Sequence, residues 1–299
     1  MIGLTIKQLR YFDALARHLH FGRAAEACTI SQPALSLQIK ELENMAGAML
    51  VERGARTLRL TPIGEDFVIK ARQVLLAIDE LEDLMRVSQG PFAGRFRLGV
   101  IPTVAPYLLP DTITALTGRF PEIDLELRES VTKSLVADLL DSRLDAAVVA
   151  LPISEPALRE FALFQEDFVL VRPRKDDGKP VPSPDMLKSM RLLLLEEGHC
   201  FRDQALSFCE ITKTQPRQLM EGSSLSTLVQ MVGAGMGVTL IPEMAVALET
   251  RNANVSVVTF DRPKPNRTVG MVWRKSNPLA DQLMEVGAIV RGVGQRVGP

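Results

Sequence analysis

The chain has 299 residues, of which 46% are hydrophobic, and a formal net charge of −1 at pH 7. This length and apolar share suffice for two or three compact units with their own cores, and the near-zero charge excludes a protein that coats nucleic acid over its whole surface. The sequence contains no run of about 18 apolar residues and no secretory signal, so we expect a cytoplasmic protein without a membrane span.

The first 62 residues form a helix-rich, net basic segment, with eight Lys or Arg residues against five Asp or Glu residues. The stretch FGRAAEACTISQPALSLQIKELE predicts a helix from about Arg23 and then a tight turn through Thr29 and Ile30. A second helix follows, which Ser31 caps and which tolerates Pro33 in its first turn. Two helices joined in this way are typical of a helix-turn-helix.

The second of these helices has one polar and one apolar face. Its polar side chains are Gln32, Ser36, Gln38 and Lys40, and its apolar side chains are Leu35, Ile39 and Leu42. The polar face has the composition to enter a major groove, although an ordinary solvated face would have the same pattern.

The next segment, MLVERGARTLRLTPIG, predicts two short strands joined by a Gly-Ala-Arg turn. This wing would carry Arg53, Arg56 and Arg59 toward the phosphates or the minor groove of DNA. We therefore expect residues 1–62 to form a winged helix-turn-helix domain.

A long helix is predicted from Glu65 to Ser88, because no Gly or Pro interrupts this stretch. Its apolar side chains alternate at steps of four and three, as in a dimerising coiled coil: Phe67, Ala71, Val74, Ile78, Leu81 and Met85. A single helix packed on its own domain is the alternative. QGPFAG at residues 89–94 predicts a hinge, so residues 63–94 are interpreted as linker helix and hinge.

From residue 95 to 299, strand-like runs alternate with helix-like ones, which predicts an α/β region with mostly parallel sheets. Its size favours two subdomains around a cleft, subdomain I at about 95–166 and 271–299 and subdomain II at about 167–270. Ligands of such folds bind where strand ends meet helix starts.

The chain has three cysteines, too few for a disulfide scaffold and without the paired spacing of a zinc site. Cys200 follows a buried strand and a glycine turn, so it should begin a helix whose N-terminus favours a thiolate, together with His199 and Arg202. Alternatively, Cys200 is a small buried apolar residue, the role that we expect for Cys28.

Cys209 lies nine residues after Cys200, which on a continuous helix places the two thiols on opposite sides with a rise of about 13.5 Å. A disulfide between them would therefore require the intervening segment to unwind. A metal site at His199, Cys200 and Cys209 is disfavoured by the poor chelate spacing and the missing fourth ligand.

Two stretches, QLRYFDALARHLHFGRAAEACTISQPALSLQIKELE and MLVERGARTLRLTPIGEDF, closely resemble the DNA-binding domain of LysR-type transcriptional regulators. The remainder resembles the peroxide-sensing OxyR group of that family, through GVIPTVAPYLLP at 99–110, EEGHCFRDQALSFC at 196–209 and GAGMGVTLIP at 233–242. The region between Cys209 and Glu221 is not recognisably similar.

The resemblance implies an α/β regulatory region of two subdomains that resembles type II periplasmic binding proteins. It implies that Cys200 is the thiolate that attacks hydrogen peroxide and that Cys209 resolves the sulfenic acid as an intramolecular disulfide, which thioredoxin or glutaredoxin would reduce. It also implies a peroxide pocket and its polar surround, formed by Thr103, Thr132, His199, Arg202 and Arg267. The alternatives to these pocket roles are that Thr132 only caps a helix and that Arg267 is a solvated residue at the start of a strand.

The family further implies a homotetramer, a dimer of dimers, on double-stranded promoter DNA, with contact to RNA polymerase and without a cofactor or a metal. The residues expected to contact DNA are Arg23, Ser31, Gln32, Pro33, Ser36, Gln38, Lys40, Arg53 and Arg56. We expect a regulator and not an enzyme. Two other hypotheses stay open: a regulator that binds a small metabolite near Thr103 and Ser223, and a thiol peroxidase.

Overall fold

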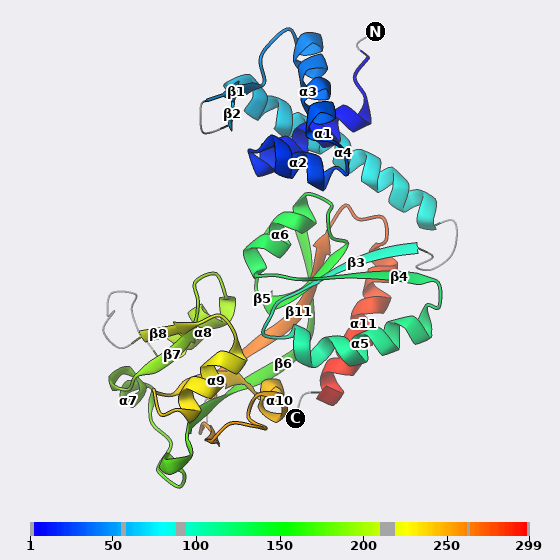
Figure 1. Cartoon of the computed structure of the whole chain (residues 1–299). Helices are drawn as coiled ribbons and strands as arrows, with labels where there is room; N and C mark the ends of the chain where they lie inside the picture. The colour runs from blue at the N-terminus through cyan, green and yellow to red at the C-terminus, as the bar shows by residue number, and fades with distance from the viewer. Residues whose placement is uncertain (1–2, 55–57, 88–93, 210–218, 262–263, 298–299) are drawn as a thin grey trace. The chain divides into compact units, whose positions relative to one another are not determined.

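The computed structural model describes residues 3–54, 58–87, 94–209, 219–261 and 264–297 (Figure 1). It consists of two compact units, residues 1–85 and 86–299, and each is described by itself. In the described part of the chain, no helix is long and apolar enough to cross a membrane.

The first unit is a winged helix-turn-helix. A three-helix core of apolar side chains, among them Phe12, Leu35 and Ile39, is followed by an antiparallel two-stranded wing. The elements are α1 (Ile6–His18), α2 (Phe21–Ala27), α3 (Gln32–Ala46), β1 (Val51–Arg53), β2 (Leu58–Leu60) and the first turns of α4 (Pro62–Val87).

Local caps determine where these helices begin. The Ser31 hydroxyl accepts a hydrogen bond from the Ala34 amide at 3.3 Å, so α3 begins at Gln32 as predicted. Helix α2 begins at Phe21, two residues before the prediction, because His20 Nδ1 accepts from the amides of Gly22 and Arg23. The turn between the two helices bends at Thr29, whose φ of 56° is left-handed.

Helix α4 packs on its own unit with its first turns. Val68, Ala71 and Leu75 are buried there, and Arg72 Nε donates to Asp13 Oδ1 at 2.7 Å. Further along, Leu81 and Met85 are exposed by 59% and 60%. The first turns of α4 thus fit the alternative of a helix packed on its own domain. Near its end the helix exposes apolar side chains, and the dimerising coiled coil remains a prediction.

The predicted hinge at 89–94 lies outside the described residues except for Gly94, which begins the first strand of the second unit. That unit contains a seven-stranded sheet in the order β10-β6-β11-β5-β3-β4, with β9 also paired to β6. Its strands are β3 (Gly94–Val100), β4 (Ile123–Glu129), β5 (Ala146–Leu151), β6 (Leu158–Pro173), β9 (Thr239–Pro242), β10 (Val255–Thr259) and β11 (Asn266–Arg274).

A separate parallel pair consists of β7 (Leu192–Leu195) and β8 (Leu219–Gly222), and a parallel bridge from Leu192 to Val238 links it to the large sheet. The strand β8 was not predicted. The helices of the second unit are α5 (Ala105–Arg119), α6 (Thr132–Leu140), α7 (Pro184–Ser189), α8 (Cys200–Phe208), α9 (Leu225–Gly233), α10 (Val246–Glu249) and α11 (Ala280–Val297), with short 3-10 turns at Arg174–Asp176 and Glu243–Ala245.

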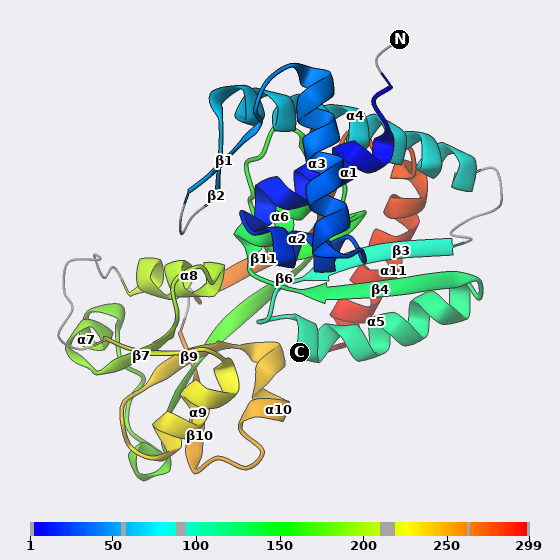
Figure 2. The same ribbon diagram turned by 45° about the horizontal axis from the view of Figure 1, so that its top comes forward.

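Two separate hydrophobic cores divide the second unit into two lobes. Lobe I is built around Leu98, Val148 and Trp273, with α5 and α11 side by side on one face of its sheet (Figures 1 and 2). Lobe II is built around Leu170 and Leu240, with α8 and α9 packed on its strands.

The expectation of mostly parallel sheets is wrong for the second unit. β3 is parallel to β4 and β5, but β11 is antiparallel to β5, and β6 is antiparallel to β9, β10 and β11. The reason is the 16-residue strand β6, which pairs with β11 in lobe I and then continues into lobe II between β9 and β10. No periodicity in a single strand reveals the direction of its neighbours.

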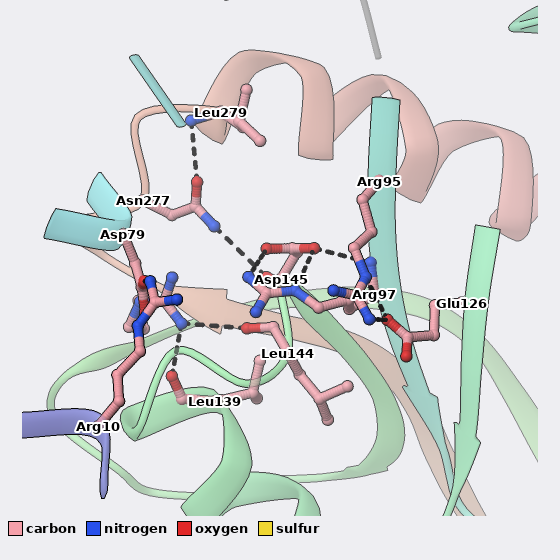
Figure 3. A network of polar contacts seen from close by, with 11 residues as sticks. Arg10, Asp79, Arg95, Arg97, Glu126, Leu139, Leu144, Asp145, Asn277 and Leu279 are labelled. Carbon is pink, nitrogen blue, oxygen red and sulfur yellow. Dashed lines mark hydrogen bonds and ion pairs between the residues drawn. The ribbon is translucent and has the colours of Figure 1, made fainter. Parts of the chain in front are cut away.

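Polar contacts fix the register of the lobe I sheet at one end (Figure 3). The fully buried Asp145 accepts from the Arg97 amide and from Arg97 Nη2, both at 2.7 Å. On the neighbouring strands, Arg95 Nε donates to Glu126 Oε2 at 2.6 Å. These bonds hold β3, which leads directly into the segment that carries Thr103.

Candidate functional site

The candidate DNA-contacting residues lie mainly on α3 and at its start. Ser31, Gln32, Pro33 and Lys40 are exposed, whereas Ser36 and Gln38 are half-buried, and Gln38 also donates to Glu41 at 2.8 Å. The opposite face is buried, as the two-faced pattern predicted. Arg23 is exposed on α2, where its guanidinium donates to the His18 carbonyl at 3.1 Å.

The wing strands form as predicted, with the exposed Arg59 on β2. Arg56 lies outside the described residues, and the side chain of Arg53 is likewise not described. The wing therefore contributes one described cation to this candidate surface.

Cys200 is the first residue of α8, at the end of a turn after β7. Gly198 provides the turn with a φ of 100°, a left-handed conformation that other residues rarely adopt. His199 occupies the N-cap without a side-chain hydrogen bond to the helix. The Cys200 side chain thus lies at the positive end of the helix, half-buried, and packs against the core of lobe I.

A narrow crevice adjoins Cys200. Its walls come from both lobes and consist of Ile101, Pro102, Thr103, Val131, Thr132, His199 and Cys200. The Thr132 hydroxyl is buried in this region and has no hydrogen-bond partner. Since α6 takes its N-cap from Val131 without a side-chain bond, the alternative that Thr132 caps the helix is wrong.

A buried charge network supports Thr103 in the wall of the crevice. Arg267 Nη1 donates to Thr103 Oγ1 at 2.7 Å and Nη2 to the Thr103 carbonyl at 3.0 Å. The same guanidinium bonds to the Glu166 carboxylate at 2.7 and 2.8 Å, with both side chains at most 2% exposed. Arg267 is therefore not solvated, and the Thr103 hydroxyl, which accepts from Arg267, keeps its own proton free to donate.

The two cations expected beside Cys200 do not both lie there. Arg202 does not line the crevice; its guanidinium donates to the Leu195 carbonyl at 2.8 Å and pairs with Glu221 at 2.6 Å. His199 lines the crevice, but burial lowers its pKa, although Glu196 and Glu129 oppose this effect. The imidazole is thus mainly neutral at neutral pH, and the helix N-terminus remains as a source of positive potential.

Cys209 ends α8 and is fully buried in the core of lobe II. Burial raises the pKa of its thiol from 9.0 to about 11, so it is protonated at neutral pH. Because one continuous helix separates it from Cys200, the two thiols lie apart, as the nine-residue spacing predicted, and all three cysteines are free. Cys28 is half-buried in the other unit.

A larger cleft of about 360 Å³ adjoins the crevice and shares Pro102, Thr103, Val131 and His199 with it. The rest of its wall is mixed: the polar residues are Tyr107, Glu129, Ser130, Ser223, Ser224, Ser226 and Glu249, and the apolar residues are Pro106, Leu195 and Leu225. Among the described residues, no group of three or more His, Cys, Asp or Glu side chains is arranged to hold a metal ion.

Sequence reasoning missed Glu166, the buried partner of Arg267. A buried guanidinium requires a counter-charge, but the two residues are 101 positions apart and nothing in the local sequence pairs them. Tyr107 and Glu249 were missed for the same reason.

Comparison with known families gives matches to both units. Residues 6–65 match the family described as bacterial regulatory helix-turn-helix protein, lysR family, and residues 89–292 match the LysR substrate binding domain. A probable hydrogen peroxide-inducible genes activator from Streptomyces viridosporus is 41% identical over 291 residues, which cover 96% of this chain and 93% of that protein.

Two solved structures are also similar over nearly their whole length. Full-length OxyR from Pseudomonas aeruginosa, in a single-residue variant, has a TM-score of 0.74 and 35% identity, covering 96% of this chain and 95% of its own. A cysteine-to-serine variant of Corynebacterium glutamicum OxyR with bound hydrogen peroxide has a TM-score of 0.67 and 33% identity, covering 98% and 93%.

Proposed function

Since the chain belongs to the LysR family of DNA-binding transcriptional regulators, and within it to the OxyR group of peroxide-inducible activators, we propose that it senses hydrogen peroxide by oxidation of Cys200. The observation that carries the proposal is the crevice beside Cys200, in which the Thr132 hydroxyl is buried without a partner. A buried hydroxyl without a partner destabilises the protein, so the group is interpreted as a contact for a small ligand that forms hydrogen bonds.

Hydrogen peroxide fits the donors and acceptors of this crevice. Each of its hydroxyl groups donates one hydrogen bond and accepts others, and the hydroxyls of Thr103 and Thr132 both do the same. The crevice is closed to water-sized molecules in this conformation, so binding of peroxide would require a local shift of the side chains that line it.

In the proposed reaction, the Cys200 thiolate attacks one peroxide oxygen. An S–O bond forms, the O–O bond breaks, and the leaving hydroxide takes up a proton to become water. The Cys209 thiol, after loss of its proton, attacks the sulfenic sulfur of Cys200. An S–S bond forms, the S–O bond breaks, and the leaving hydroxide takes up a proton to become a second water. Two thiols are oxidised and one peroxide is reduced to two waters, and an external dithiol such as thioredoxin or glutaredoxin restores the thiols.

The second step requires a change of fold. The thiols of Cys200 and Cys209 lie at opposite ends of α8, whereas a disulfide needs Cα atoms within about 7 Å. The helix must therefore unwind, and Cys209 must leave the core of lobe II. We propose that this local refolding alters the contacts of a homotetramer, a dimer of dimers on promoter DNA, and through them the contact with RNA polymerase.

Binding of a small metabolite in the neighbouring cleft is the second candidate function. The observation that favours it is the size of the cleft, about 360 Å³, with several hydroxyl and carboxylate groups in its walls. In that case Cys200 and Cys209 would be incidental to the signal.

The test is mass spectrometry of the reduced protein after one equivalent of hydrogen peroxide, followed by alkylation and digestion. We expect a peptide that links Cys200 to Cys209 and that dithiothreitol separates. Cys200→Ser should abolish both the link and the peroxide-dependent change in the DNA footprint, and Cys28→Ser is the matched control that should leave both intact. If both thiols of the wild type stay alkylatable, the redox proposal is wrong and the metabolite candidate remains.

A further inference from the structure

Two side chains cross between the lobes in opposite directions. Cys200 belongs to α8 of lobe II but packs against the core of lobe I. Tyr107 belongs to α5 of lobe I but packs against the core of lobe II. The surroundings of Cys200 therefore depend on how firmly the two lobes are held together.

The Tyr107 hydroxyl is part of a hydrogen-bonded group with Glu249 and Ser226. It donates to Glu249 Oε1 at 2.6 Å, and the Ser226 hydroxyl donates to Glu249 Oε2 at 2.5 Å. Glu249 is only 9% exposed, and among the described residues it has no ion-pair partner. Two hydroxyl donors from α5 and α9 thus stabilise a largely buried carboxylate on α10.

The bond from Tyr107 stays intact over the physiological pH range. Burial and the hydrogen bond to Glu249 raise the pKa of Tyr107, so the phenol remains a donor. The distance of 2.6 Å is that of a charge-assisted bond, which is about twice as strong as a neutral one.

This group lines the same cleft as Thr103 and His199, two residues that also line the crevice beside Cys200. Tyr107 lies in the first turn of α5, four residues after Thr103, and both residues line the cleft that His199 also lines. Because Thr103 lines the crevice with Cys200 and directly precedes α5, any displacement of the first turn of α5 from lobe II would shift the Thr103 wall of the crevice.

We propose that Tyr107, Glu249 and Ser226 form a latch between the lobes that holds the Thr103 wall of the crevice against Cys200. They are positioning residues for oxidation of Cys200, since they act on the crevice wall and not on peroxide itself. The latch rests on the proposed peroxide-sensing function.

Tyr107→Phe and Glu249→Gln test the latch in the full-length reduced protein. Each variant should lower the second-order rate constant for oxidation of Cys200 by hydrogen peroxide by about tenfold, because Tyr107→Phe removes the charge-assisted hydrogen bond and Glu249→Gln replaces it with a weaker neutral one. The rate of Cys200 alkylation by iodoacetamide should stay within about twofold of wild type, because this reagent does not use the crevice hydroxyls. Tyr11→Phe removes the hydroxyl of the only other tyrosine and is the matched control.

The double variant Tyr107→Phe/Glu249→Gln should be no slower than either single variant, because both changes open the same latch. Parallel changes in the peroxide and iodoacetamide rates would show a general effect on the fold and overturn the latch, as would peroxide rates equal to wild type. If wild-type Cys200 itself does not react with peroxide, the proposed function fails. If it reacts and the variants react equally fast, only the latch fails.

Discussion

The substitution Glu166→Gln tests the buried charge network beneath the peroxide crevice. It removes the charge that compensates Arg267, whose side chain is fully buried and which makes bonds of 2.7 and 2.8 Å to Glu166. Removing one partner of a buried ion pair costs about 3–5 kcal/mol. For a domain of this size, the melting temperature should therefore fall by roughly 6–20 °C.

The assay is equilibrium unfolding of the reduced protein in urea, followed by fluorescence of Trp273. This residue is the single tryptophan of the chain and is fully buried in lobe I, so the signal reports on the regulatory unit alone. The control is Glu166→Leu combined with Arg267→Met, which removes both charges and should recover most of the lost stability. Its Cys200 should still react slowly with peroxide, because Thr103 has lost its donor.

Two results would refute this reasoning. A loss below about 1 kcal/mol in Glu166→Gln would mean that the guanidinium is not left uncompensated in a dry environment. A double variant as unstable as the single one would mean that shape, and not charge, determines the stability of this site.

Three further predictions concern other parts of the molecule. Thr132→Val removes a buried hydroxyl without a partner, so the reduced protein should gain about 1 kcal/mol in urea unfolding while its peroxide rate falls; no change in either value would contradict the role of the crevice. Burial raises the pKa of the Cys209 thiol from 9.0 to about 11, so the unfolded chain loses this proton first. As the pH rises across that range in reductant, wild type should therefore lose roughly 3 kcal/mol of stability relative to Cys209→Ala. A stability difference that is independent of pH would contradict this assignment. Arg59→Ala should weaken binding to promoter and random DNA alike and reduce the slope of log K against log salt by about 1; a loss confined to the promoter would contradict a phosphate contact.

The parts of the structure that the sequence predicts well are those that local chemistry determines. Ser31 caps α3 and Cys200 begins α8, because a cap or a glycine turn needs only residues a few positions away. The start of α2 was misplaced since His20, an uncommon capping residue, takes this role.

The prediction that Arg202 stabilises the Cys200 thiolate relied on their closeness in the sequence, which was misleading. Two residues after Cys200 on a helix, its side chain does not share a face with the thiol, and it pairs with Glu221 on β8 instead. Contacts between residues that are distant in the chain could not be predicted for a different reason. Tyr107 and Glu249 are 142 positions apart, and only the folded structure brings them together.

The strand β6 limits what kind of motion the regulatory unit can use. It pairs with β11 in lobe I and with β9 and β10 in lobe II, so a wide opening of the two lobes would have to bend this strand or break some of its backbone hydrogen bonds. Strand β6 therefore lets the two lobes twist slightly relative to each other but resists their separation. Oxidation at Cys200 would then act by refolding the short helix α8, while the large sheet that joins the two lobes keeps its conformation.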